Sequence, residues 1–399
     1  MPAMNTPTHY GGVTKTFHWL TALLVLTLIP LGLIANRLPY ETSEQLTTKA
    51  WLFSLHKTLG ITLFFVALMR IIWALMGPKP ALLHPDRKLE SFAAETAHWL
   101  LYGSLVLAPL TGWIYHAATT GFAPIWWPLG QNLPLVPKSE TIAELSAGLH
   151  SVFTKVMAAT ILLHIAGALK HHVVDRDATL HRMLPGHTTL PDLALQRHSA
   201  APLAGAVAVW VLSLGVGAAF GLFNAGEGPV QAAELSDIAS DWAVQDGSID
   251  IRVTQFGSEV SGQFTDWTAA ITFDPEVATG TAGSVTATIS IGSLALGSVT
   301  DQAMGPDFFD AATFPTAMFQ GDIVHANDGF DAVGTLTIKD QTVPLTLPFG
   351  LSLNEGTAEI DGRIALDRRD FAIGDNMSDE SSLAFGVEVL IRLTATQIP

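Results

Sequence analysis

The sequence predicts a membrane-spanning all-α four-helix bundle with a fifth transmembrane helix, followed by a soluble antiparallel β-barrel. Three observations predict this fold class. The 399 residues are only 14% charged, whereas soluble domains average about 25%. Charge is also divided unevenly, because residues 1–226 hold 14 Lys+Arg and 10 Asp+Glu while residues 227–399 hold 6 and 26. Finally, the hydrophobic periodicity changes between these two parts, which indicates two domains in different environments.

Five apolar stretches in the first part approach or exceed the ~20 residues that a helix needs to cross a bilayer. They cover residues 14–35, 51–76, 93–116, 147–170 and 203–225. The first stretch is too long for the apolar core of a signal peptide and lacks a small-residue cleavage site. We therefore interpret it as a retained span.

The loop charges predict the orientation of these spans. With a cytoplasmic N-terminus, the inner segments contain eight cations and the outer loops three. The inner cations are Lys15, Lys79, Arg87, Lys88, Lys170, Arg176, Arg182 and Arg197, and the outer ones are Arg37, Lys49 and Lys138. Because positive residues stay on the cytoplasmic side, we expect a multi-pass protein of the bacterial inner membrane. Five spans then place its C-terminal part in the periplasm.

From about residue 234 onward, apolar and polar residues alternate with period two. Clear examples are residues 248–253, 284–289 and 334–339, and clusters of Gly, Asp and Asn separate such runs. This pattern is typical of an antiparallel sheet closed into a sandwich or barrel. We therefore predict a helical domain at 1–190, a linker with the fifth span at 191–233, and a β-barrel at 234–399.

The linker allows two interpretations. The sequence predicts an uncut membrane anchor over the apolar run. However, Arg197, the run itself and the small residues before Glu234 also resemble an internal export signal. Cleavage near Ala233 would release the barrel.

Four histidines lie inside or at the ends of the apolar stretches: His18, His56, His150 and His164. An ionisable side chain within a bilayer is costly and is by default a functional candidate. His150 and His164 are 14 residues apart, which on one helix means about 21 Å along the axis and about 40° in direction. One helix can therefore offer a ligand to each of two macrocycles, one near each membrane surface.

Matched depths then predict two ligand pairs. His18 and His164 lie towards the inner surface, and His56 and His150 lie towards the outer one. The chain has no cysteine, which excludes iron–sulfur clusters and covalently attached c-type haem. We therefore expect two non-covalent haem b groups with bis-histidine ligation, which favours electron transfer over oxygen binding.

Other histidines compete with this assignment. His98, near the inner start of the third stretch, could replace His18 or His164, or could hydrogen-bond a haem propionate. Any single intramembrane histidine could simply hydrogen-bond across helices. The sequence favours interfacial positions for His171 and His172. His84, His181, His187 and His198 lie in loops, where solvated side chains are the default.

Three cations lie within the apolar stretches: Lys57, Arg70 and Lys155. Each could be a surface anchor that extends its charge to the interface. Each could equally neutralise a haem propionate or an anionic substrate, because buried carboxylates need cationic partners. We weigh these two roles equally for Lys57 and Arg70, and we favour the anchor for Lys155.

A series of motifs runs through residues 10–185. In order they are Tyr10 and Lys15, Phe17-His18-Trp19-Leu20, Leu55-His56-Lys57-Thr58-Leu59-Gly60, Met69-Arg70-Ile71, Ala97-His98-Trp99, Pro109-Leu110-Thr111-Gly112-Trp113, Gly148-Leu149-His150, Leu163-His164-Ile165-Ala166-Gly167, Lys170-His171-His172, and Arg182-Met183-Leu184-Pro185. In order and spacing, they resemble the bacterial cytochrome b561 family. This resemblance implies a four-helix bundle with two b-type haems, bound through His18, His56, His150 and His164. It also implies electron exchange between a quinone and an outer partner, including superoxide oxidation in some members.

The second part carries motifs of its own, the most specific being Asp307-Phe308-Phe309-Asp310 and Asp367-Arg368-Arg369-Asp370-Phe371. Over about residues 241–395, this part resembles the YceI family. The resemblance implies a lipocalin-like barrel for a long isoprenoid-type lipid, and a small barrel has just enough interior for one slim ligand. An ordinary packed core is the alternative explanation for the apolar strand faces.

Together these observations predict a di-haem cytochrome that transfers electrons between a periplasmic donor, such as superoxide, and the ubiquinone pool. The tethered barrel would bind a quinone-like or polyisoprenoid lipid. The acidic barrel makes nucleic acid an unsuitable partner. The alternative function is non-enzymatic: a lipid-binding or stress-response module that the cytochrome part anchors or regulates by its redox state.

Overall fold

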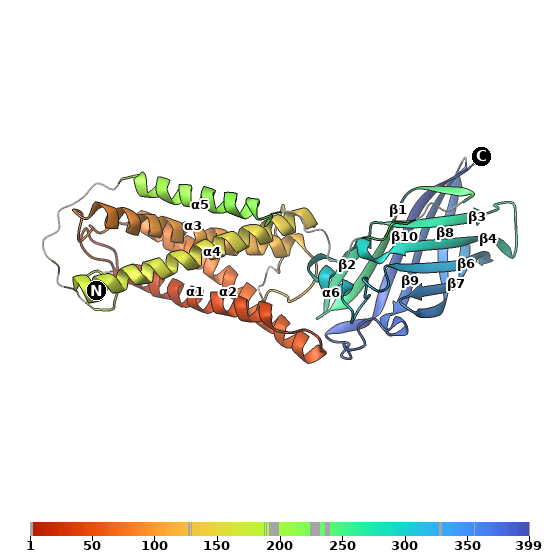
Figure 1. The fold of residues 1–399 in the computed structure, drawn as a ribbon, viewed down its shortest axis with the longest axis horizontal. Helices are drawn as coiled ribbons and strands as arrows, with labels where there is room; N and C mark the ends of the chain where they lie inside the picture. Colours follow the sequence, from red (N-terminus) through yellow and green to blue (C-terminus); the bar gives the residue numbers. More distant parts are fainter. Residues whose placement is uncertain are drawn as a thin grey trace. The chain divides into compact units, whose positions relative to one another are not determined.

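The computed structural model describes residues 3–126, 128, 130–186, 188, 190, 199–223, 232–235, 240–326, 329–354 and 356–398. These residues form two compact units. The first comprises Met1–Leu38, Trp51–Ala118 and Ile125–Ala225, and the second comprises Pro39–Ala50, Thr119–Pro124 and Gly226–Pro399. The long helices belong wholly or mostly to the first unit, and the β-strands belong to the second (Figure 1).

Each predicted span corresponds to a long helix. The helices are α1 Gly12–Arg37, α2 Ser43–Met76, α3 Lys88–Ala118, α4 Glu140–Lys170 and α5 Ala201–Ala219, and a π-helical turn, η1 His171–Asp175, continues α4. Within the described residues, α1, α2, α5 and α4 together with its π-helical turn are long and apolar enough to cross a membrane. Helix α3 is as long as α4, with 31 residues each, so its composition alone keeps it out of this group.

The core of the bundle brings together one side of each of the first four helices. Its buried residues are Val25, Leu28, Leu63, Ala67, Leu105, Ala108, Phe153 and Met157. Trp210 of α5 packs against this core. A Cβ atom at Gly103 of α3 would lie 2.1 Å from the Trp210 ring, so α5 can approach α3 only because residue 103 is glycine. Small residues at helix contacts are typical of membrane bundles, where close packing drives association.

Two buried cations join the end of α4 to the start of the bundle. The Lys15 ammonium donates to the main-chain oxygen of Leu184 at 2.7 Å. The Arg182 guanidinium donates to the oxygens of Ala81 at 3.0 Å and Thr8 at 2.7 Å. These cations therefore hold loop carbonyls in place at the end of the bundle that contains the N-terminus.

The second unit contains one antiparallel sheet. Among the described residues its strands are β1 Trp242–Gln255, β2 Ser258–Phe264, β3 Trp267–Phe273, β4 Thr281–Ser290, β5 Leu294–Ala295, β6 Thr316–Ala326, β7 Gly329–Ile338, β8 Gln341–Asn354, β9 Thr357–Asp367 and β10 Leu383–Gln397. They pair in the order β3-β4-β6-β7-β8-β9-β10-β1-β2-β5. Four short helical segments cap the sheet: η2 Ile291–Ser293, η3 Gly297–Val299, α6 Thr300–Met304 and η4 Arg368–Phe371.

The sheet curls so that the start of β1 contacts β3. The backbone N–H of Asp241 donates to the oxygen of Ile271 at 3.0 Å, and the indole of Trp242 donates to the oxygen of Phe273 at 3.0 Å. The side chains of Ile249 and Ile251 are buried inside the curled sheet, while Arg252, the next residue of β1, is exposed on its outer face. Each buried isoleucine contributes about 1.5–3 kcal/mol relative to an exposed one. The predicted fold class, an apolar helical bundle followed by a lipocalin-like antiparallel β domain, is confirmed.

The junction between the two parts is only partly described. Arg197 and Gln231, which contribute to the export-signal interpretation, lie outside the described residues. The backbone N–H of Ala233 donates to the Ser290 hydroxyl at 2.8 Å, so this residue is bound to the β domain. Cleavage near Ala233 stays a prediction.

Candidate functional site

His56 on α2 and His150 on α4 are held in the same way. Nδ1 of His56 lies 3.1 Å from the main-chain oxygen of Leu28. Nδ1 of His150 lies 2.7 Å from that of Ala108. Because a carbonyl oxygen can only accept, each Nδ1 carries the proton, and the lone pair of each ring is then on Nε2. This tautomer and orientation are typical of histidines that bind a metal through Nε2.

Two glycines leave room for these rings. A Cβ at Gly32 of α1 would lie 2.8 Å from Cε1 of His56, and a Cβ at Gly112 of α3 would lie 3.0 Å from Nδ1 of His150. A Cβ at Gly32 would come closer than real Cβ atoms do, and one at Gly112 would be tighter than most, so each ring packs against bare helix backbone. Each ring is therefore held in a fixed orientation against a neighbouring helix, an arrangement that would suit a haem ligand.

Three histidines gather at the other level of the bundle: His18 on α1, His98 on α3 and His164 on α4. The ring centres of His18 and His164 are 6.2 Å apart, and those of His98 and His164 are 5.3 Å apart in an edge-on arrangement. Two imidazoles that bind one metal, with bonds of about 2 Å each, have ring centres about 6 Å apart. This spacing is compatible with the predicted pair His18 and His164, and it places His98 beside His164 as well. The choice of ligands among these three histidines stays a prediction.

The intramembrane cations lie beside these histidines. Arg70 lies within electrostatic range of His18, His98 and His164, and its guanidinium lies 5.3 Å from the centre of the Tyr102 ring. Lys57 is buried and lies within the same range of His56 and His116.

In contrast, the exposed Lys155 donates to the hydroxyl of Ser151 at 2.8 Å. These positions favour the propionate or anion role for Arg70 and Lys57, and the surface role for Lys155.

His116 on α3 is a further histidine near the site that was not predicted from the sequence. This residue interacts electrostatically with His56 and His150 and is half-buried at the end of α3. His98 and His116 are 18 residues apart, which is five helical turns, so both lie on the same side of α3. Its position at the end of the apolar stretch 93–116 was the signal that could have identified it. Helix α3 thus places one additional histidine beside each predicted pair.

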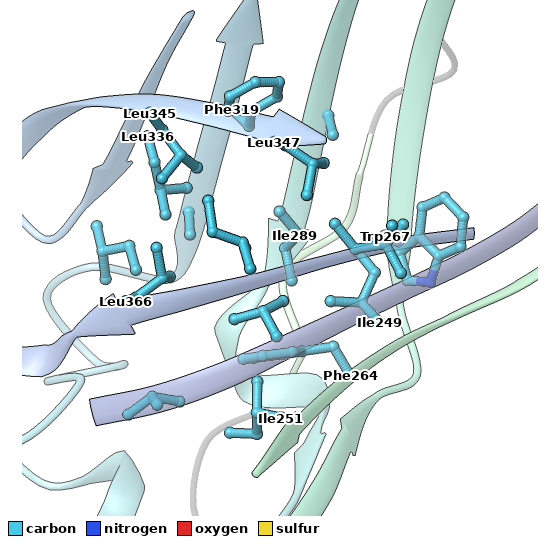
Figure 2. A pocket seen from close by; sticks show the side chains of 18 of the residues that line it. Ile249, Ile251, Phe264, Trp267, Ile289, Phe319, Leu336, Leu345, Leu347 and Leu366 are labelled. Carbon is cyan, nitrogen blue, oxygen red and sulfur yellow. The ribbon is translucent and has the colours of Figure 1, made fainter. Parts of the chain in front are cut away.

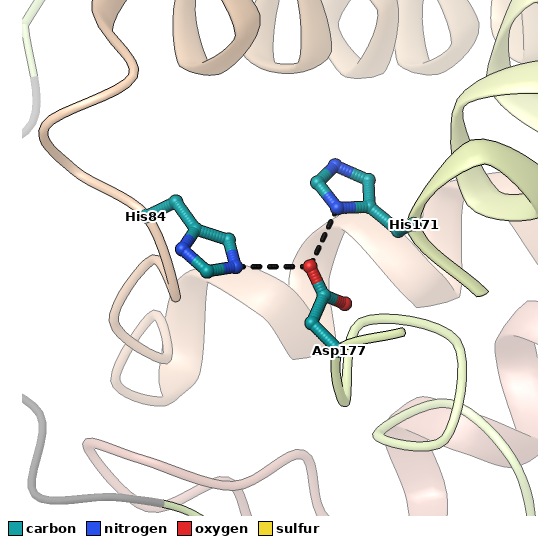
Figure 3. A group of neighbouring side chains, drawn as sticks. All are labelled: His84, His171 and Asp177. Carbon is teal, nitrogen blue, oxygen red and sulfur yellow. Dashed lines mark hydrogen bonds and ion pairs between the residues drawn. The ribbon is translucent and has the colours of Figure 1, made fainter. Parts of the chain in front are cut away.

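A polar cluster closes the end of the bundle near His164 (Figure 3). The Asp177 carboxylate lies between two imidazoles, 2.9 Å from Nε2 of His84 and 2.7 Å from Nδ1 of His171. The two rings are parallel, with centres 6.1 Å apart. His84 precedes α3, while His171 and Asp177 follow α4, so the cluster joins distant segments. We predicted a solvated His84 and an interfacial His171, and neither prediction included the contact of both rings with Asp177.

The charge state of the cluster follows from its contacts. Burial alone would raise the pKa of the Asp177 carboxyl, but hydrogen bonds from Thr179, His171 and His84 hold this pKa well below its usual range. The carboxylate is therefore ionised at neutral pH, next to two groups that can carry protons. Its oxygen and the two ring nitrogens lie within 4.8 Å of one another, so the cluster could alternatively hold a divalent metal.

The curled sheet encloses an apolar cavity of about 300 Å³. Figure 2 shows the side chains of Ile249, Phe264, Ile289, Phe319 and Leu366 pointing from different strands into one space. The interior is therefore not filled by its own side chains, which argues against the packed-core alternative. The volume suits one slim apolar chain.

Arg368, from the Asp367-Arg368-Arg369-Asp370-Phe371 motif, is buried in the wall of this cavity. Its guanidinium donates to the main-chain oxygens of Ala384, Ile373, Gly374, Met377 and Leu383. A guanidinium has five N–H donors, and these contacts use all of them. Arg368 therefore organises the segment between β9 and β10.

Comparison with known proteins agrees with this division. The family model described as prokaryotic cytochrome b561 matches residues 9–186, and the YceI-like domain matches residues 242–395. Cytochrome b561 homolog 2 of Escherichia coli (strain K12) is 30% identical over 188 residues, which are 46% of this chain and 95% of that protein. A protein of Yersinia pestis named probable superoxide oxidase CybB is 26% identical over 177 residues, 44% of this chain and 96% of that one.

Solved structures also match the second part. Burkholderia cenocepacia BcnA is 32% identical with a TM-score of 0.36, covering 38% of this chain and 96% of that chain. A Campylobacter jejuni YceI protein is 19% identical with a TM-score of 0.31, covering 43% and 91%. The two family models and the Escherichia coli relative confirm the predicted resemblances to both families, and the first family implies b-type haem and electron transport. The chain belongs to the prokaryotic cytochrome b561 family and carries a YceI-like domain after its membrane helices.

Proposed function

We propose that this protein carries electrons through two b-type haems from a periplasmic donor to ubiquinone, and that its barrel binds a quinone-like or polyisoprenoid lipid. The observation that carries the proposal is the pairing of histidines at two levels. His56 and His150 present Nε2 from fixed rings, and His18 and His164 are 6.2 Å apart. His150 and His164 share α4, which sets the two levels about 21 Å apart.

Each haem would supply a one-electron carrier at its level, while the side chains set its position. His56 and His150 would hold the outer group, with Lys57 as the candidate partner of a propionate. His18 and His164 would hold the inner group, with Arg70 in the corresponding role. Two histidine ligands for each iron would leave no position open for oxygen, which would favour electron transfer without oxygen binding.

The proposed quinone reaction requires protons as well as electrons. Reduction of ubiquinone to ubiquinol consumes two electrons and two protons. His171 follows His164 by seven residues, two helical turns, so the His84–Asp177–His171 cluster begins about 10 Å from the inner ligand on the same side of the helix. Its imidazoles can donate protons and recover them from the cytoplasm. This supports quinone reduction at the inner level.

The proposed donor is superoxide. Two superoxide ions would give two electrons and two molecules of O₂, which balances the reduction of one ubiquinone. The support is the similarity to the Yersinia pestis protein, whose name includes this activity. The cation bias of the loops supports a cytoplasmic N-terminus and a periplasmic barrel.

A tethered lipid carrier would assist this reaction. The apolar cavity can hold part of an isoprenoid chain, and a tether makes the encounter between carrier and cytochrome intramolecular, which raises the effective concentration.

The test uses the full-length protein in lipid nanodiscs under anaerobic conditions. Dithionite-reduced protein should show b-type α-bands, and these should disappear on addition of ubiquinone with formation of ubiquinol. Haem that ubiquinone does not oxidise would contradict the proposal. Membranes that lack b-type bands but retain lipid in the barrel would instead favour the non-enzymatic alternative.

A further inference from the structure

Two imidazoles and a carboxylate converge at one end of the helical bundle. Nε2 of His84 and Nδ1 of His171 both point to the same oxygen of Asp177, Oδ2, at 2.9 Å and 2.7 Å (Figure 3). The three atoms lie within 4.8 Å of one another. They are the atoms through which histidine and aspartate bind transition metals. The group therefore has the composition of a metal site, apart from the predicted haem ligands.

The segment after α4 orients the carboxylate of Asp177. Its other oxygen, Oδ1, accepts the backbone N–H of Thr179 at 2.8 Å, which leaves Oδ2 for the rings. His171 begins the π-helical turn η1, and Arg176 after this turn has a left-handed backbone with φ of 53°. This reversal brings Asp177 back to His171, whose main-chain oxygen accepts the Asp177 N–H at 3.1 Å. Such π-helical turns often mark functional sites, and hydrogen bonds to a carboxylate typically orient it for a metal.

The neighbouring charges favour this group over a second one. Glu90, His171 and Asp175 also lie close enough together to hold an ion. However, the Lys170 ammonium forms ion pairs with both Glu90 and Asp175, and the Arg87 guanidinium also pairs with both carboxylates. These charges cancel, so a metal ion in the second group would have to displace a bound cation. Among the ion pairs of the described residues, the carboxylate of the first group meets imidazoles instead.

Solvent reaches the first group, so an ion can enter and keep a bound water. The side chains of His84, His171 and Asp177 are 33%, 21% and 13% exposed. Two imidazoles favour Zn²⁺ and related transition metals over Mg²⁺ and Ca²⁺, which prefer oxygen ligands. In a tetrahedral zinc site with bonds of about 2.0–2.1 Å, neighbouring ligand atoms are about 3.4 Å apart. Each ring nitrogen therefore has to move only about 0.6 Å farther from Oδ2 when the ion enters.

We propose that His84, His171 and Asp177 form a binding site for Zn²⁺, with water as the fourth ligand. The ion binds Nε2 of His84, Nδ1 of His171 and Oδ2 of Asp177, and it links the segment before α3 to the segment after α4. It occupies the ring nitrogens that carry protons in the proposed function, so it slows ubiquinone reduction. This effect on the rate rests on the proposed function, whereas binding of the ion does not.

The binding experiment uses the full-length, haem-loaded protein without a histidine tag, in nanodiscs, with empty nanodiscs as the blank. Calorimetry should show a Zn²⁺ site that excess Mg²⁺ does not fill, and X-ray absorption at the zinc edge should show two imidazole ligands. His84→Gln and His171→Gln should each weaken this site by at least about tenfold, since loss of even an outer-shell partner costs about 10–100-fold. Retained b-type α-bands show that each variant is folded.

His172→Gln is the matched control. His172 is exposed, and its ring lies 5.3 Å from the ring of His181, so the affinity for Zn²⁺ should not change. Absence of Zn²⁺ binding by the wild-type protein would overturn the site. Equal affinities of wild type, His84→Gln and His171→Gln, or a loss of affinity in His172→Gln, would overturn it as well.

The effect on the rate is measured separately by stopped-flow spectroscopy. Zn²⁺ should slow ubiquinone-dependent oxidation of haem at least about tenfold in wild type and in His172→Gln, and the same concentration should not change the rate of His84→Gln. Zn²⁺ that binds at the site without slowing oxidation would overturn the inhibition. Haem that ubiquinone does not oxidise even without Zn²⁺ would contradict the proposed function, while the binding result would still support the site.

Discussion

His150 on α4 donates from Nδ1 to the main-chain oxygen of Ala108 on α3, at 2.7 Å. The contact is possible because Gly112, one turn further along α3, has no Cβ to displace the ring. It fixes the imidazole and leaves Nε2 to face the proposed outer haem.

Gly112→Ala should alter the outer haem without loss of the fold. The new Cβ would lie 3.0 Å from Nδ1 of His150, so the ring must shift and its hydrogen bond must weaken. We expect a changed midpoint potential or low-spin EPR signal for one haem. Gly60→Ala is the matched control, because a Cβ there meets nothing within 4 Å. Identical spectra for both variants would argue against His150 as a ligand.

Asp177→Asn should slow quinone reduction more than haem reduction. The substitution removes the carboxylate that contacts both His84 and His171. We expect a roughly tenfold slower ubiquinone-dependent reoxidation of haem, less than the ~10²–10⁴-fold contributed by a proton-transfer group itself, because both imidazoles remain. Stopped-flow spectroscopy measures both steps. Asp86→Asn, an exposed residue two positions after His84, should leave both rates unchanged, and an equal effect of the two variants would exclude the cluster from the reaction.

The same carboxylate predicts an acid dependence of stability. Because the folded pKa of Asp177 lies below its unfolded value, its stabilising contribution is present above about pH 4 and is lost as the pH falls through the folded pKa. Thermal unfolding between pH 6 and pH 3 should therefore show a smaller loss of Tm for Asp177→Asn than for wild type. A steeper loss in the variant would contradict the stated direction of the pKa shift.

Arg368→Lys should destabilise the barrel strongly. Lysine has three N–H donors, so at least two of the five carbonyls that Arg368 binds would lose their partner in a buried site. We expect a loss of about 2–5 kcal/mol in unfolding free energy, measured by chemical denaturation with circular dichroism at strand wavelengths. Arg392→Lys is the control, because Arg392 is exposed and pairs with the exposed Asp361. If both variants unfold at the same denaturant concentration, the carbonyl contacts of Arg368 contribute little.

Much of the fold could be predicted from the sequence because periodicity and burial reflect it directly. The apolar stretches became helices α1 to α5, and the alternation at 248–253 became the inward-facing Ile249 and Ile251 of β1. The histidine levels also follow from helix geometry alone. His150 and His164 belong to one helix, so their separation does not depend on how the bundle packs.

Contacts between distant segments could not be predicted. His84 and Asp177 are 93 residues apart, and they meet only through the packing of two loops at one end of the bundle. The role of Gly112 depends on which side of α3 faces His150, and a weakly amphipathic helix does not reveal that side.

The central claim is the pairing of four histidines around two haems, and the most direct measurement is the number of haems per chain in single-histidine variants. Pyridine haemochrome analysis with EPR should give two low-spin haems in the wild-type protein. His56→Ala and His150→Ala should each remove the same one, and His18→Ala and His164→Ala the other, while His98→Gln and His116→Gln retain both. A single haem in the wild-type protein, or loss of a haem in His98→Gln or His116→Gln, would contradict this pairing.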